Sequence, residues 1–439
     1  MDNQNTIKVY YEASVIGAGR SNKLAKTGIN RVATELLHAI KQQGEVDIIP
    51  ICRSYDLSRS LLEEVGEDEF NNSALIGQIK SCERLKAISR PLEPSPSSLL
   101  QGTLVRSILS RAKEKGRTIF NRLIDEQFQN ATNKLINSNS PKNLVFHDTY
   151  MKTCLKAPGI HRIYTVYDLI PILYPDYFDS HMSAHHKSFL SSISSNDYIL
   201  CISESTKNDL ISSFPHINPD HAKVVHLAGS SIFKPIQDKD TISRAIKHVG
   251  INEEENYFLS ICTHEPRKNI RRVVEAFIEL HKSHQSDNFN IKLLLVGSSG
   301  WGKNSIFDLI KEAGMSSHIL CPGFVSDEFL PALCSRALAF IYPSLYEGFG
   351  LPALEAMQCG CPVISSITSS MPEVVGNSGI LIDPLDTRSL CQNMKELMIN
   401  SVLRKKLGQE GLKRSTLFSW DKAARETISV YREALRVNP

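Results

Sequence analysis

The chain has 439 residues, 41% of them hydrophobic and 22% charged, so it is long enough for two or three globular domains. Its 50 basic and 47 acidic residues give a net charge of +3, which excludes the strongly basic balance of many nucleic-acid-binding proteins. No apolar run reaches the roughly 18 residues that span a bilayer, and the first residues lack a signal-peptide pattern, which predicts a cytoplasmic protein with peripheral membrane contact allowed.

The pair Gly17-Ala-Gly19 follows the first apolar stretch and begins like a dinucleotide-binding fingerprint. The third glycine position of that fingerprint holds Asn22, and the helical spacing of apolar residues begins only after Gly28. A loop of roughly ten residues is therefore expected between the first strand and its helix. Two alternatives remain at this point, a nicotinamide or flavin site and a different kind of phosphate loop.

Beyond this loop, the chain alternates short β-rich runs with longer segments of helical periodicity. The strand candidates are apolar, and each is followed by a turn signal: 46–51, 143–146, 163–166, 198–202, 292–296, 337–341 and 362–365. The alternation predicts parallel sheets covered by helices, with ligands bound beyond the carboxyl ends of the strands. Because the pattern restarts near 257–261, after the loop 226–235, we predict two Rossmann-like halves that meet at a cleft.

A Pro- and Ser-rich stretch, 89–98, interrupts the first half and is followed by a polar helical segment, which predicts an insertion over about 80–140. Within it, residues 101–117 combine an apolar helical face with basic side chains that only Glu114 opposes. Two interpretations remain for this helix. It is either a peripheral contact with the inner face of a membrane or a helix packed on its own domain with a solvated charged side.

Cysteine and histidine spacing indicates neither disulfides nor a metal site. The ten cysteines lack CxxC spacing, which predicts reduced, mostly buried thiols. His181, His185 and His186 stand at helical spacing, but no zinc motif completes them, so a solvated helix face is predicted. Asp238-Lys-Asp240 is predicted to lie in a polar loop and not to act as a metal-binding DxD motif.

The strongest chemical signal lies in residues 342–366, YPSLYEGFGLPALEAMQCGCPVISS. After a predicted strand end, the glycine loop 347–350 leads into a short helix with Pro352 in its first turn. Backbone N–H groups of the loop and of the helix N-terminus favour a phosphate or another anionic leaving group. Glu347 and Glu355 flank this anion site and are better suited to sugar hydroxyls than to phosphate. The alternative is an ordinary strand-to-helix turn with two exposed acids.

The acid pair Glu347-x7-Glu355 in EGFGLPALEAMQCGCPV resembles the signature of glycosyltransferase family 4, whose members are retaining enzymes of GT-B fold. Further stretches resemble this family in the expected order: 26–37, 165–178, 201–210, 262–270, 323–337 and 418–435. The bacterial branch with O-antigen mannosyltransferases is the most similar. The resemblance covers most of the chain outside the insertion.

This resemblance implies two Rossmann-like parallel-sheet domains that face a central cleft. An acceptor-side domain is expected over 1–228, a nucleotide-sugar-binding domain over 229–417, and a C-terminal helix over 418–439 that packs back on the first domain. The implied activity is retaining transfer of a hexose, with GDP-mannose as the expected donor, to a saccharide or lipid-linked saccharide acceptor in bacterial surface polysaccharide synthesis. The nucleotide sugar is a substrate, so no cofactor, metal or nucleic acid is expected.

Donor-site roles follow from the resemblance residue by residue. Glu347 is expected to contact the donor sugar, and Glu355 to hold the ribose hydroxyls. Arg267 and Lys268 are expected to neutralise the diphosphate, with a surface ion pair as the alternative. Backbone contacts to sugar and diphosphate are expected from Gly348, Phe349, Gly350 and Leu351.

The remaining roles concern the borders of the donor and the acceptor side. Gly28 is expected against the donor phosphates, which replaces the dinucleotide interpretation of the first loop, while Phe324 and Val325 are expected to border the base. On the acceptor side, His147 and Asp168 are candidate catalytic residues, with Asp148 as a further candidate. For His147 the alternative is a hydrogen-bonded histidine at a strand end. Family members carry histidine where this chain has Tyr167, which leaves the role of that ring open.

Two other classes of function remain open. A GT-B nucleotide-sugar epimerase or hydrolase would share the nucleotide lobe but needs its own acid and base residues around a smaller pocket. A catalytically silent nucleotide-sugar-binding protein is the alternative outside enzymes. The presence of Arg267, Lys268, Glu347 and Glu355 disfavours it.

Overall fold

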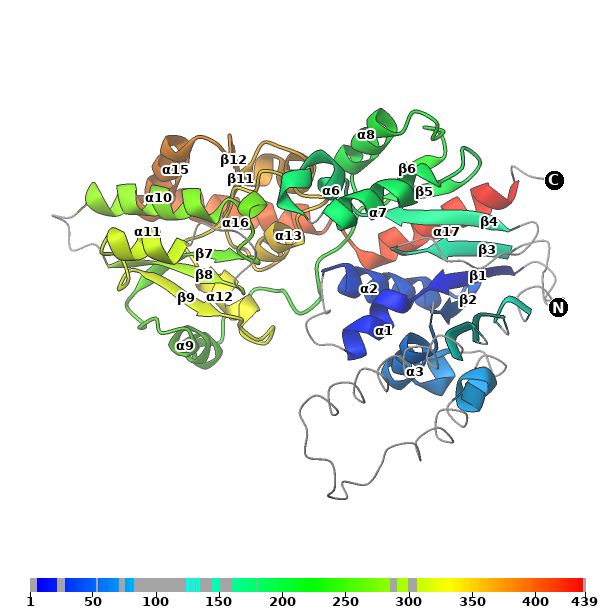
Figure 1. The fold of residues 1–439 in the computed structure, drawn as a ribbon. Coiled ribbons are helices and arrows are strands. Elements are labelled where there is room, and N and C mark those ends of the chain that lie inside the picture. The colour runs from blue at the N-terminus through cyan, green and yellow to red at the C-terminus, as the bar shows by residue number, and fades with distance from the viewer. Residues whose placement is uncertain are drawn as a thin grey trace, which may run out of the picture. The chain divides into compact units, whose positions relative to one another are not determined.

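The computed structural model describes residues 6–21, 28–52, 54–70, 76–82, 124–126, 128–130, 132–134, 144–150, 160–178, 180–284, 290–298 and 306–436. Two six-stranded sheets organise these residues (Figure 1). The predicted amphipathic helix over 101–117, and with it most of the predicted insertion, lies outside the described residues. Among the helices that the structure describes, none has the length and apolar character needed to cross a bilayer.

The first sheet is parallel wherever its register is defined, as the strand–helix alternation predicted. Its strand order is β2-β1-β3-β4-β5-β6. The bounds are Ile7–Glu12 for β1, Val46–Ile51 for β2, Leu144–Asp148 for β3, His161–Val166 for β4, Tyr198–Cys201 for β5 and Ala222–Val224 for β6. Strand β3 is buried along its whole length, as expected for a parallel strand covered on both faces.

The second sheet has the order β12-β11-β10-β7-β8-β9, and its pairs are also parallel. Its strands are Asn256–Ile261 (β7), Ile291–Val296 (β8), Ile319–Gly323 (β9), Ala339–Tyr342 (β10), Val363–Ser366 (β11) and Ile380–Ile382 (β12). The strand order reverses between β7 and β10. In parallel sheets, ligands bind outside the carboxyl ends of the strands at such a reversal, so the loops after β7 and β10 are where a site is expected.

Helices connect the strands in both sheets. Those of the first part are Ser14–Ser21 (α1), Gly28–Gln43 (α2), Tyr55–Phe70 (α3), Ile170–Leu173 (α6), Ser180–Ser191 (α7) and Glu204–Ser213 (α8). The later ones are Lys239–His248 (α9), Ile270–Lys282 (α10), Ile306–Glu312 (α11), Leu330–Arg336 (α12), Leu351–Gln358 (α13), Met371–Val375 (α14), Thr387–Ile399 (α15), Ser401–Ser415 (α16) and Trp420–Arg436 (α17). The buried face of α2 includes Val32, Leu36, Leu37 and Ile40, which confirms the helical spacing read from the sequence.

The predicted loop after the first strand is wrong in part, because Gly17 and Gly19 lie in helix α1. The Glu12 side chain accepts a hydrogen bond from the Ser14 amide at 2.9 Å at the start of this helix. The Asn30 side chain donates to the Val15 carbonyl at 2.7 Å. These side-chain partners satisfy backbone groups of a short helix that apolar spacing alone does not reveal.

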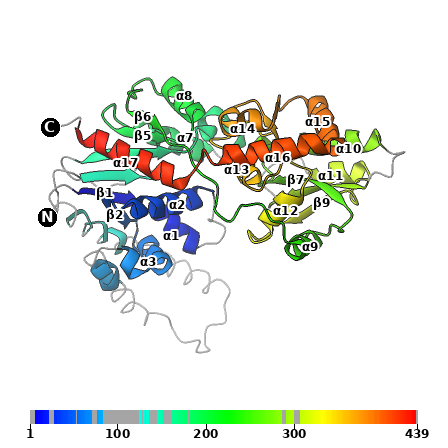
Figure 2. The same ribbon diagram turned by 180° about the vertical axis from the view of Figure 1, so that it is seen from behind.

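The chain divides into two compact units. Unit 1 contains residues 1–165, 196–200 and 424–439, and unit 2 contains residues 166–195 and 201–423. The predicted domain limits at residues 228 and 417 stay a prediction. From Ala424 onward, α17 belongs to unit 1, where it lies along the first sheet (Figure 2).

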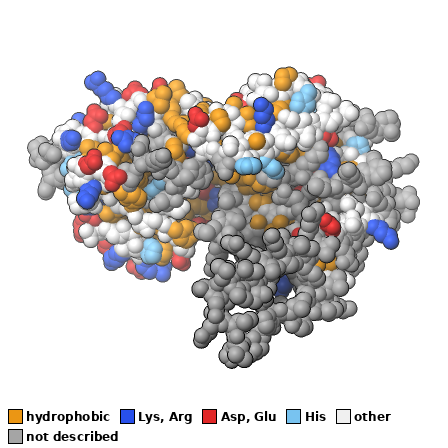
Figure 3. Space-filling model, in the orientation of Figure 1, with side chains coloured by type: hydrophobic (Ala, Val, Ile, Leu, Met, Phe, Trp, Pro, Cys, Tyr) orange, Lys and Arg blue, Asp and Glu red, His pale blue; other side chains and the backbone are white. Residues whose placement is uncertain are grey.

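Side-chain chemistry outside the site agrees with the composition. Each described cysteine is a free thiol, and all are buried except the half-buried Cys321, which confirms the prediction for this part of the chain. Basic and acidic side chains are interspersed over the visible described surface (Figure 3). Asp238 is exposed and caps α9 by accepting a hydrogen bond from the Thr241 amide at 2.9 Å. Lys239 and Asp240 lie in the first turn of α9, so the predicted polar loop is wrong for these two residues.

Candidate active site

The loops that follow β7 and β10 are tied together by one asparagine. Asn269 adopts a left-handed backbone conformation with φ of 59° at the start of α10. Its side-chain amide donates to the carbonyl of Pro343 at 3.0 Å and to that of Pro384 at 2.6 Å. The preceding residues 266–268 form a 3₁₀ turn, and this turn carries Arg267 and Lys268 to the same edge of the sheet as the glycine loop.

Arg267, Lys268 and Glu347 form a buried charge cluster at this edge. The Lys268 Nζ lies 2.6 Å from Glu347 Oε1 and 2.6 Å from the hydroxyl of Tyr342. An Arg267 guanidinium nitrogen lies 3.1 Å from Glu347 Oε2, and its Nε lies 2.9 Å from a Glu265 oxygen. Lys268 is 8% exposed and Glu347 is 7% exposed, whereas Arg267 is half-buried, so the alternative of a surface ion pair does not describe Lys268.

The two cations fix the ionisation of Glu347. Burial alone would raise the pKa of this carboxyl, but the charges of Lys268 and Arg267 outweigh burial and lower the pKa to about 2. Burial alone would lower the pKa of Arg267, but the negative charges of Glu347 and Glu265 outweigh burial and leave this pKa raised. Glu347 is therefore an ionised hydrogen-bond acceptor at neutral pH and has no proton to donate.

Close packing explains the glycines of the loop 347–350. A Cβ on Gly348 would lie 2.2 Å from the backbone oxygen of Tyr167, so no side chain fits there. Gly350 has φ of 104°, and a Cβ there would lie 2.6 Å from the sulfur of Met371. Helix α13 starts directly after Gly350 and carries Pro352 in its first turn, as the sequence predicted.

Two serines that the sequence analysis missed hold the loop backbone. The Ser369 hydroxyl oxygen accepts from the Glu347 amide at 2.9 Å. The Ser370 hydroxyl lies 2.9 Å from the carbonyls of both Glu347 and Phe349. The Ser- and Thr-rich stretch after β11 was a visible signal for such side-chain-to-backbone bonds. Tyr342, which holds Lys268, carried no signal beyond its place at a strand end.

Glu355 occupies a separate position on α13. It is 6% exposed, and one of its oxygens lies 3.3 Å from the Ser230 amide, which donates to it. Gly229 precedes this contact, and a Cβ there would lie 2.0 Å from the Gln358 side chain. Because Glu347 and Glu355 are both buried, the alternative of a turn with two exposed acids is wrong.

With this geometry in place, comparisons with known proteins identify the family. Residues 241–414 match the family model of glycosyl transferases group 1. O-antigen chain mannosyltransferase B of Escherichia coli is 32% identical over 269 residues, which are 61% of this chain and 69% of that protein. The chain belongs to the group 1 glycosyltransferases. The resemblance to family 4 and to its O-antigen mannosyltransferase branch is thus confirmed.

Two further comparisons set the limits of this similarity. The serotype-specific mannosyltransferase WbdA of Escherichia coli is 28% identical over 273 residues, which cover 62% of this chain but only 33% of WbdA. Sucrose-phosphate synthase of Thermosynechococcus elongatus superposes with a TM-score of 0.63 over 99% of this chain and all of that chain, at 17% identity. At that identity the match shows the fold alone, and the glycosyltransferase has the predicted GT-B fold with its two parallel sheets.

Asp168 lies in the same unit of the glycosyltransferase as Glu347. Its carboxylate accepts from the Ile170 amide at 2.9 Å, and its carbonyl oxygen lies 3.1 Å from a ring nitrogen of His186. Burial raises its pKa more than the Ile170 amide and the charge of Arg267 lower it. His181 and His185 are exposed on α7, as predicted, whereas His186 is half-buried through its contact with Asp168.

His147 lies in unit 1 at the end of β3 and is fully buried. One ring nitrogen lies 2.8 Å from the hydroxyl of Tyr431 on α17, and the other lies 2.8 Å from the hydroxyl of Thr165 on β4. Burial lowers its pKa to about 3, so the ring is neutral near pH 7. This arrangement matches the alternative of a hydrogen-bonded strand-end histidine, and a catalytic role stays a prediction. Asp148 is likewise buried, 2.8 Å from Arg162.

We expect Tyr431→Phe to separate these two roles of His147. Loss of the hydroxyl leaves a buried ring nitrogen without its partner, so the free energy of unfolding should fall by roughly 1–3 kcal/mol. The rate per folded molecule should not change, because the hydroxyl only joins α17 to β3. Urea unfolding together with the pH dependence of kcat checks this. A lower kcat or a displaced pH profile in a fully folded variant would favour a catalytic His147.

The other predicted residues have mixed exposure. Phe324 is 81% exposed after β9, whereas Val325 is 3% exposed and packs in the core, so its side chain is not available to a base. Gly28 starts α2 in unit 1, and a Cβ there would meet open space. Their binding roles stay predictions. Among the described residues, no group of three or more His, Cys, Asp and Glu side chains has a metal-binding arrangement.

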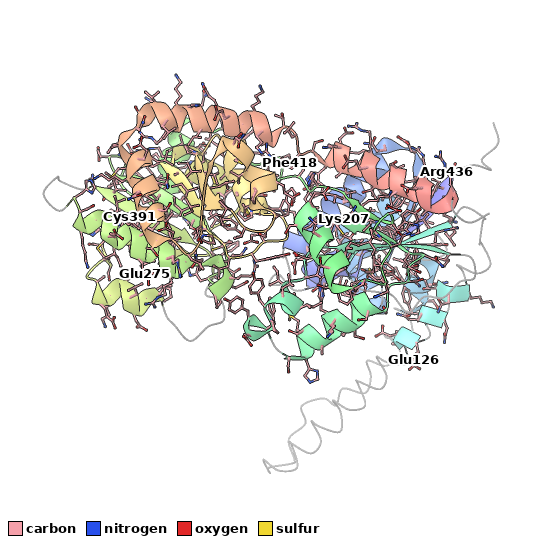
Figure 4. The ribbon with its side chains drawn as sticks, turned by 90° about the horizontal axis from the view of Figure 1, so that it is seen from above. Glu126, Lys207, Glu275, Cys391, Phe418 and Arg436 are labelled. Carbon is pink, nitrogen blue, oxygen red and sulfur yellow. The ribbon has the colours of Figure 1, made fainter. Side chains whose placement is uncertain are left out.

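Phe349 of the glycine loop packs against the C-terminal part of the chain. Its ring centroid lies 5.7 Å from that of Phe418, which precedes α17 (Figure 4), and 6.0 Å from that of His226. The rings of His226 and Phe418 are themselves 5.7 Å apart. The loop that carries Glu347 is therefore supported by a three-ring cluster from distant parts of the sequence.

Proposed function

We propose that this glycosyltransferase moves a hexosyl group, with GDP-mannose as the expected donor, to a saccharide or lipid-linked saccharide acceptor in bacterial surface polysaccharide synthesis. The observation that carries the proposal is the buried cluster of Arg267, Lys268 and Glu347 at the strand-order reversal of the second sheet. The names of two relatives, O-antigen chain mannosyltransferase B and WbdA, support mannose as the transferred sugar.

The charge cluster supports a chemistry in which the diphosphate is the leaving group. Arg267 and Lys268 supply positive charge where the negative charge of the departing diphosphate develops. The ionised Glu347 accepts hydrogen bonds from hydroxyls of the donor sugar, and the glycine loop places backbone N–H groups beside it. Both oxygens of Glu347 already accept from cations, which disfavours a role as covalent nucleophile.

The proposed reaction retains the configuration of the anomeric carbon. The bond between this carbon and the diphosphate oxygen breaks through an oxocarbenium-like transition state. The acceptor oxygen then bonds to the same face of the carbon, and the acceptor proton passes to the departing diphosphate. A nucleoside diphosphate is a good leaving group, so no protein acid is required. A retaining glycosidase instead needs two carboxyl groups about 5 Å apart around one bond.

A thermal unfolding screen with nucleotide sugars, followed by turnover assays, tests this proposal. A ligand that binds the native state raises the unfolding midpoint by mass action, and we expect GDP-mannose to give the largest rise. Lys268→Met should lose the rise, whereas Lys292→Met should keep it. Lys292 is a matched control because its ion pair with Glu255, at 3.1 Å, lies at the amino ends of β7 and β8.

Turnover with GDP-mannose and a saccharide acceptor should persist in EDTA, because cationic side chains supply the counter-charge. A chelator-sensitive activity that magnesium or manganese restores would contradict this part. Free mannose or an epimer formed from the donor alone would favour the hydrolase or epimerase class. A protein that binds the donor without consuming it would be a silent binding protein.

Glu355→Ala should weaken nucleotide binding by roughly 1–3 kcal/mol, the usual cost of losing hydrogen bonds to a charged partner. The reason is that Glu355 is proposed to hold the ribose hydroxyls. Isothermal titration calorimetry with GDP measures the change. Titration with mannose 1-phosphate is the control, since that ligand has neither guanine nor ribose. A loss of affinity for both ligands, or for neither, would contradict the assignment.

A further inference from the structure

Three tyrosines gather beside Glu347 in unit 2 and take no part in the proposed donor site. Tyr174 follows α6, Tyr177 ends the 3₁₀ turn 175–177, and Tyr346 directly precedes Glu347. The rings of Tyr174 and Tyr177 are parallel to within 3°, with centroids 5.8 Å apart. The centroid of Tyr346 lies 5.6 Å from that of Tyr174.

The packing of this tyrosine cluster leaves aromatic surface in contact with solvent. Parallel rings at this separation are offset, so each covers only part of the face of the other. Tyr346 is 6% exposed, whereas Tyr174 and Tyr177 are half-buried. Their neighbours Leu173 and Asp176 are exposed. The cluster therefore contains one buried ring, Tyr346, and two rings that are partly exposed to solvent, Tyr174 and Tyr177.

A carboxylate, Asp209, borders the tyrosine cluster. Asp209 of α8 accepts a hydrogen bond from the Tyr346 hydroxyl. Burial, and then the charges of Tyr177 and Asp209, raise the pKa of Tyr174. One hydroxyl bond occupies only part of the acceptor capacity of a carboxylate, which has about four lone-pair sites.

The cluster is connected to the proposed donor-sugar position by the backbone. The Tyr346 carbonyl lies 3.4 Å from an Arg267 guanidinium nitrogen, and the next residue is Glu347 itself. Asp168 also belongs to this neighbourhood, because a Cβ on Gly348 would lie 3.1 Å from the Asp168 Cβ. A ligand on the tyrosine cluster would therefore lie beside the sugar held by Glu347.

Pyranose rings are suited to such a surface. The C–H groups on one face of a pyranose carry partial positive charge and stack on the negative face of an aromatic ring, while water leaves both apolar surfaces. Carboxylates at the edge accept hydrogen bonds from the hydroxyls. A phosphate would be repelled by Asp209, and a lipid chain would offer no hydroxyl to the remaining lone pairs of this carboxylate.

We propose that Tyr174, Tyr177 and Tyr346, together with Asp209, form a saccharide subsite that stacks a pyranose ring of the acceptor. The subsite rests on the proposed function, because it places an acceptor sugar next to the donor sugar. The subsite also implies that the reactive end of the acceptor is a sugar, whether or not that sugar is linked to a lipid. The rings act as binding residues and take no part in bond breaking.

Sugar binding without donor tests the subsite independently of turnover. The probes are methyl α-mannopyranoside and an α-linked mannobiose, observed by saturation-transfer difference NMR on the full chain. Saturation transfer is expected in the wild type and should be lost in Tyr174→Ala and Tyr177→Ala. Tyr174→Phe should keep it, because phenylalanine retains the aromatic face. His318→Ala, which removes one ring of the His281–His318 pair at the amino end of β9, is the matched aromatic control and should also keep it.

Kinetics supply the second readout. Each alanine variant should raise the acceptor KM about five- to tenfold, as expected for the loss of one stacking contact, with kcat and nucleotide affinity unchanged. A wild type that gives no saturation transfer, or alanine variants with unchanged acceptor KM, would overturn the subsite while glycosyl transfer stands. If the wild type turns over no nucleotide sugar, the proposed function fails, and the NMR result still decides the subsite.

Discussion

Glu347→Gln should lower kcat by roughly 10²–10³-fold and leave nucleotide affinity nearly unchanged. Glutamine keeps the shape of the side chain but removes the charge that orders Arg267 and Lys268 and accepts the sugar hydroxyls. The ribose and base contacts lie elsewhere, so GDP should still bind. Steady-state kinetics and GDP titration measure the two effects. Alanine is a poorer choice, because it also removes the side-chain oxygen that the buried Lys268 contacts, and breaking a buried ion pair costs about 3–5 kcal/mol of stability.

Glu255→Gln is the matched control for this variant. Glu255 is also buried and paired with a lysine, Lys292, but at the amino end of β7. It should reduce stability without changing kcat or nucleotide affinity. Equal losses of kcat in the two variants would show that Glu347 acts only through folding. A large loss of nucleotide affinity in Glu347→Gln would contradict the assignment of this acid to the sugar.

Acidification should remove a large part of the stability that Glu347 contributes. Its pKa is about 2 in the folded chain and near 4.5 when unpaired, so ionisation stabilises the fold above pH 4.5, and this stabilisation is lost as pH falls toward 2. The difference corresponds to roughly 3 kcal/mol. Other carboxyls, such as Glu373, also have a lowered pKa, so the wild type must be compared with Glu347→Gln.

Urea unfolding of both proteins at pH 6 and pH 3 isolates this contribution. The stability advantage of the wild type over Glu347→Gln should be about 2 kcal/mol smaller at pH 3 than at pH 6. Glu255→Gln serves again as the control for a buried pair outside the site. An advantage that does not change between the two pH values would mean that Lys268 and Arg267 do not hold Glu347 ionised.

Local signals made the core of the site predictable from the sequence. The positive φ at Gly350, Pro352 at the start of α13 and the turn at Gly360 are local backbone features that residue type indicates directly. The alternation of strands and helices similarly identified the parallel sheets. In these segments the residues that decide the structure lie within a few positions of one another, so their spacing can be read directly.

Contacts between distant residues could not be predicted in the same way. The burial of Glu347 depends on Lys268, which lies 79 positions earlier, and His147 is held by Tyr431, 284 positions later. Helix α1 escaped detection because Glu12 and Asn30 satisfy its backbone from outside the helix. The sequence shows which residue types lie near the predicted strand ends, whereas the tertiary structure determines which of their side chains are in contact.

The most direct test of the central claim follows a single reaction mixture by ¹H and ³¹P NMR. With GDP-mannose and a mannoside acceptor, the wild type and Lys292→Met should release GDP in step with a new α-glycosidic signal, and Lys268→Met should give neither. Retention of the donor's α configuration in that signal would support the proposed mechanism. Free mannose in place of the glycoside, an inverted anomeric signal, or full turnover by Lys268→Met would contradict the account.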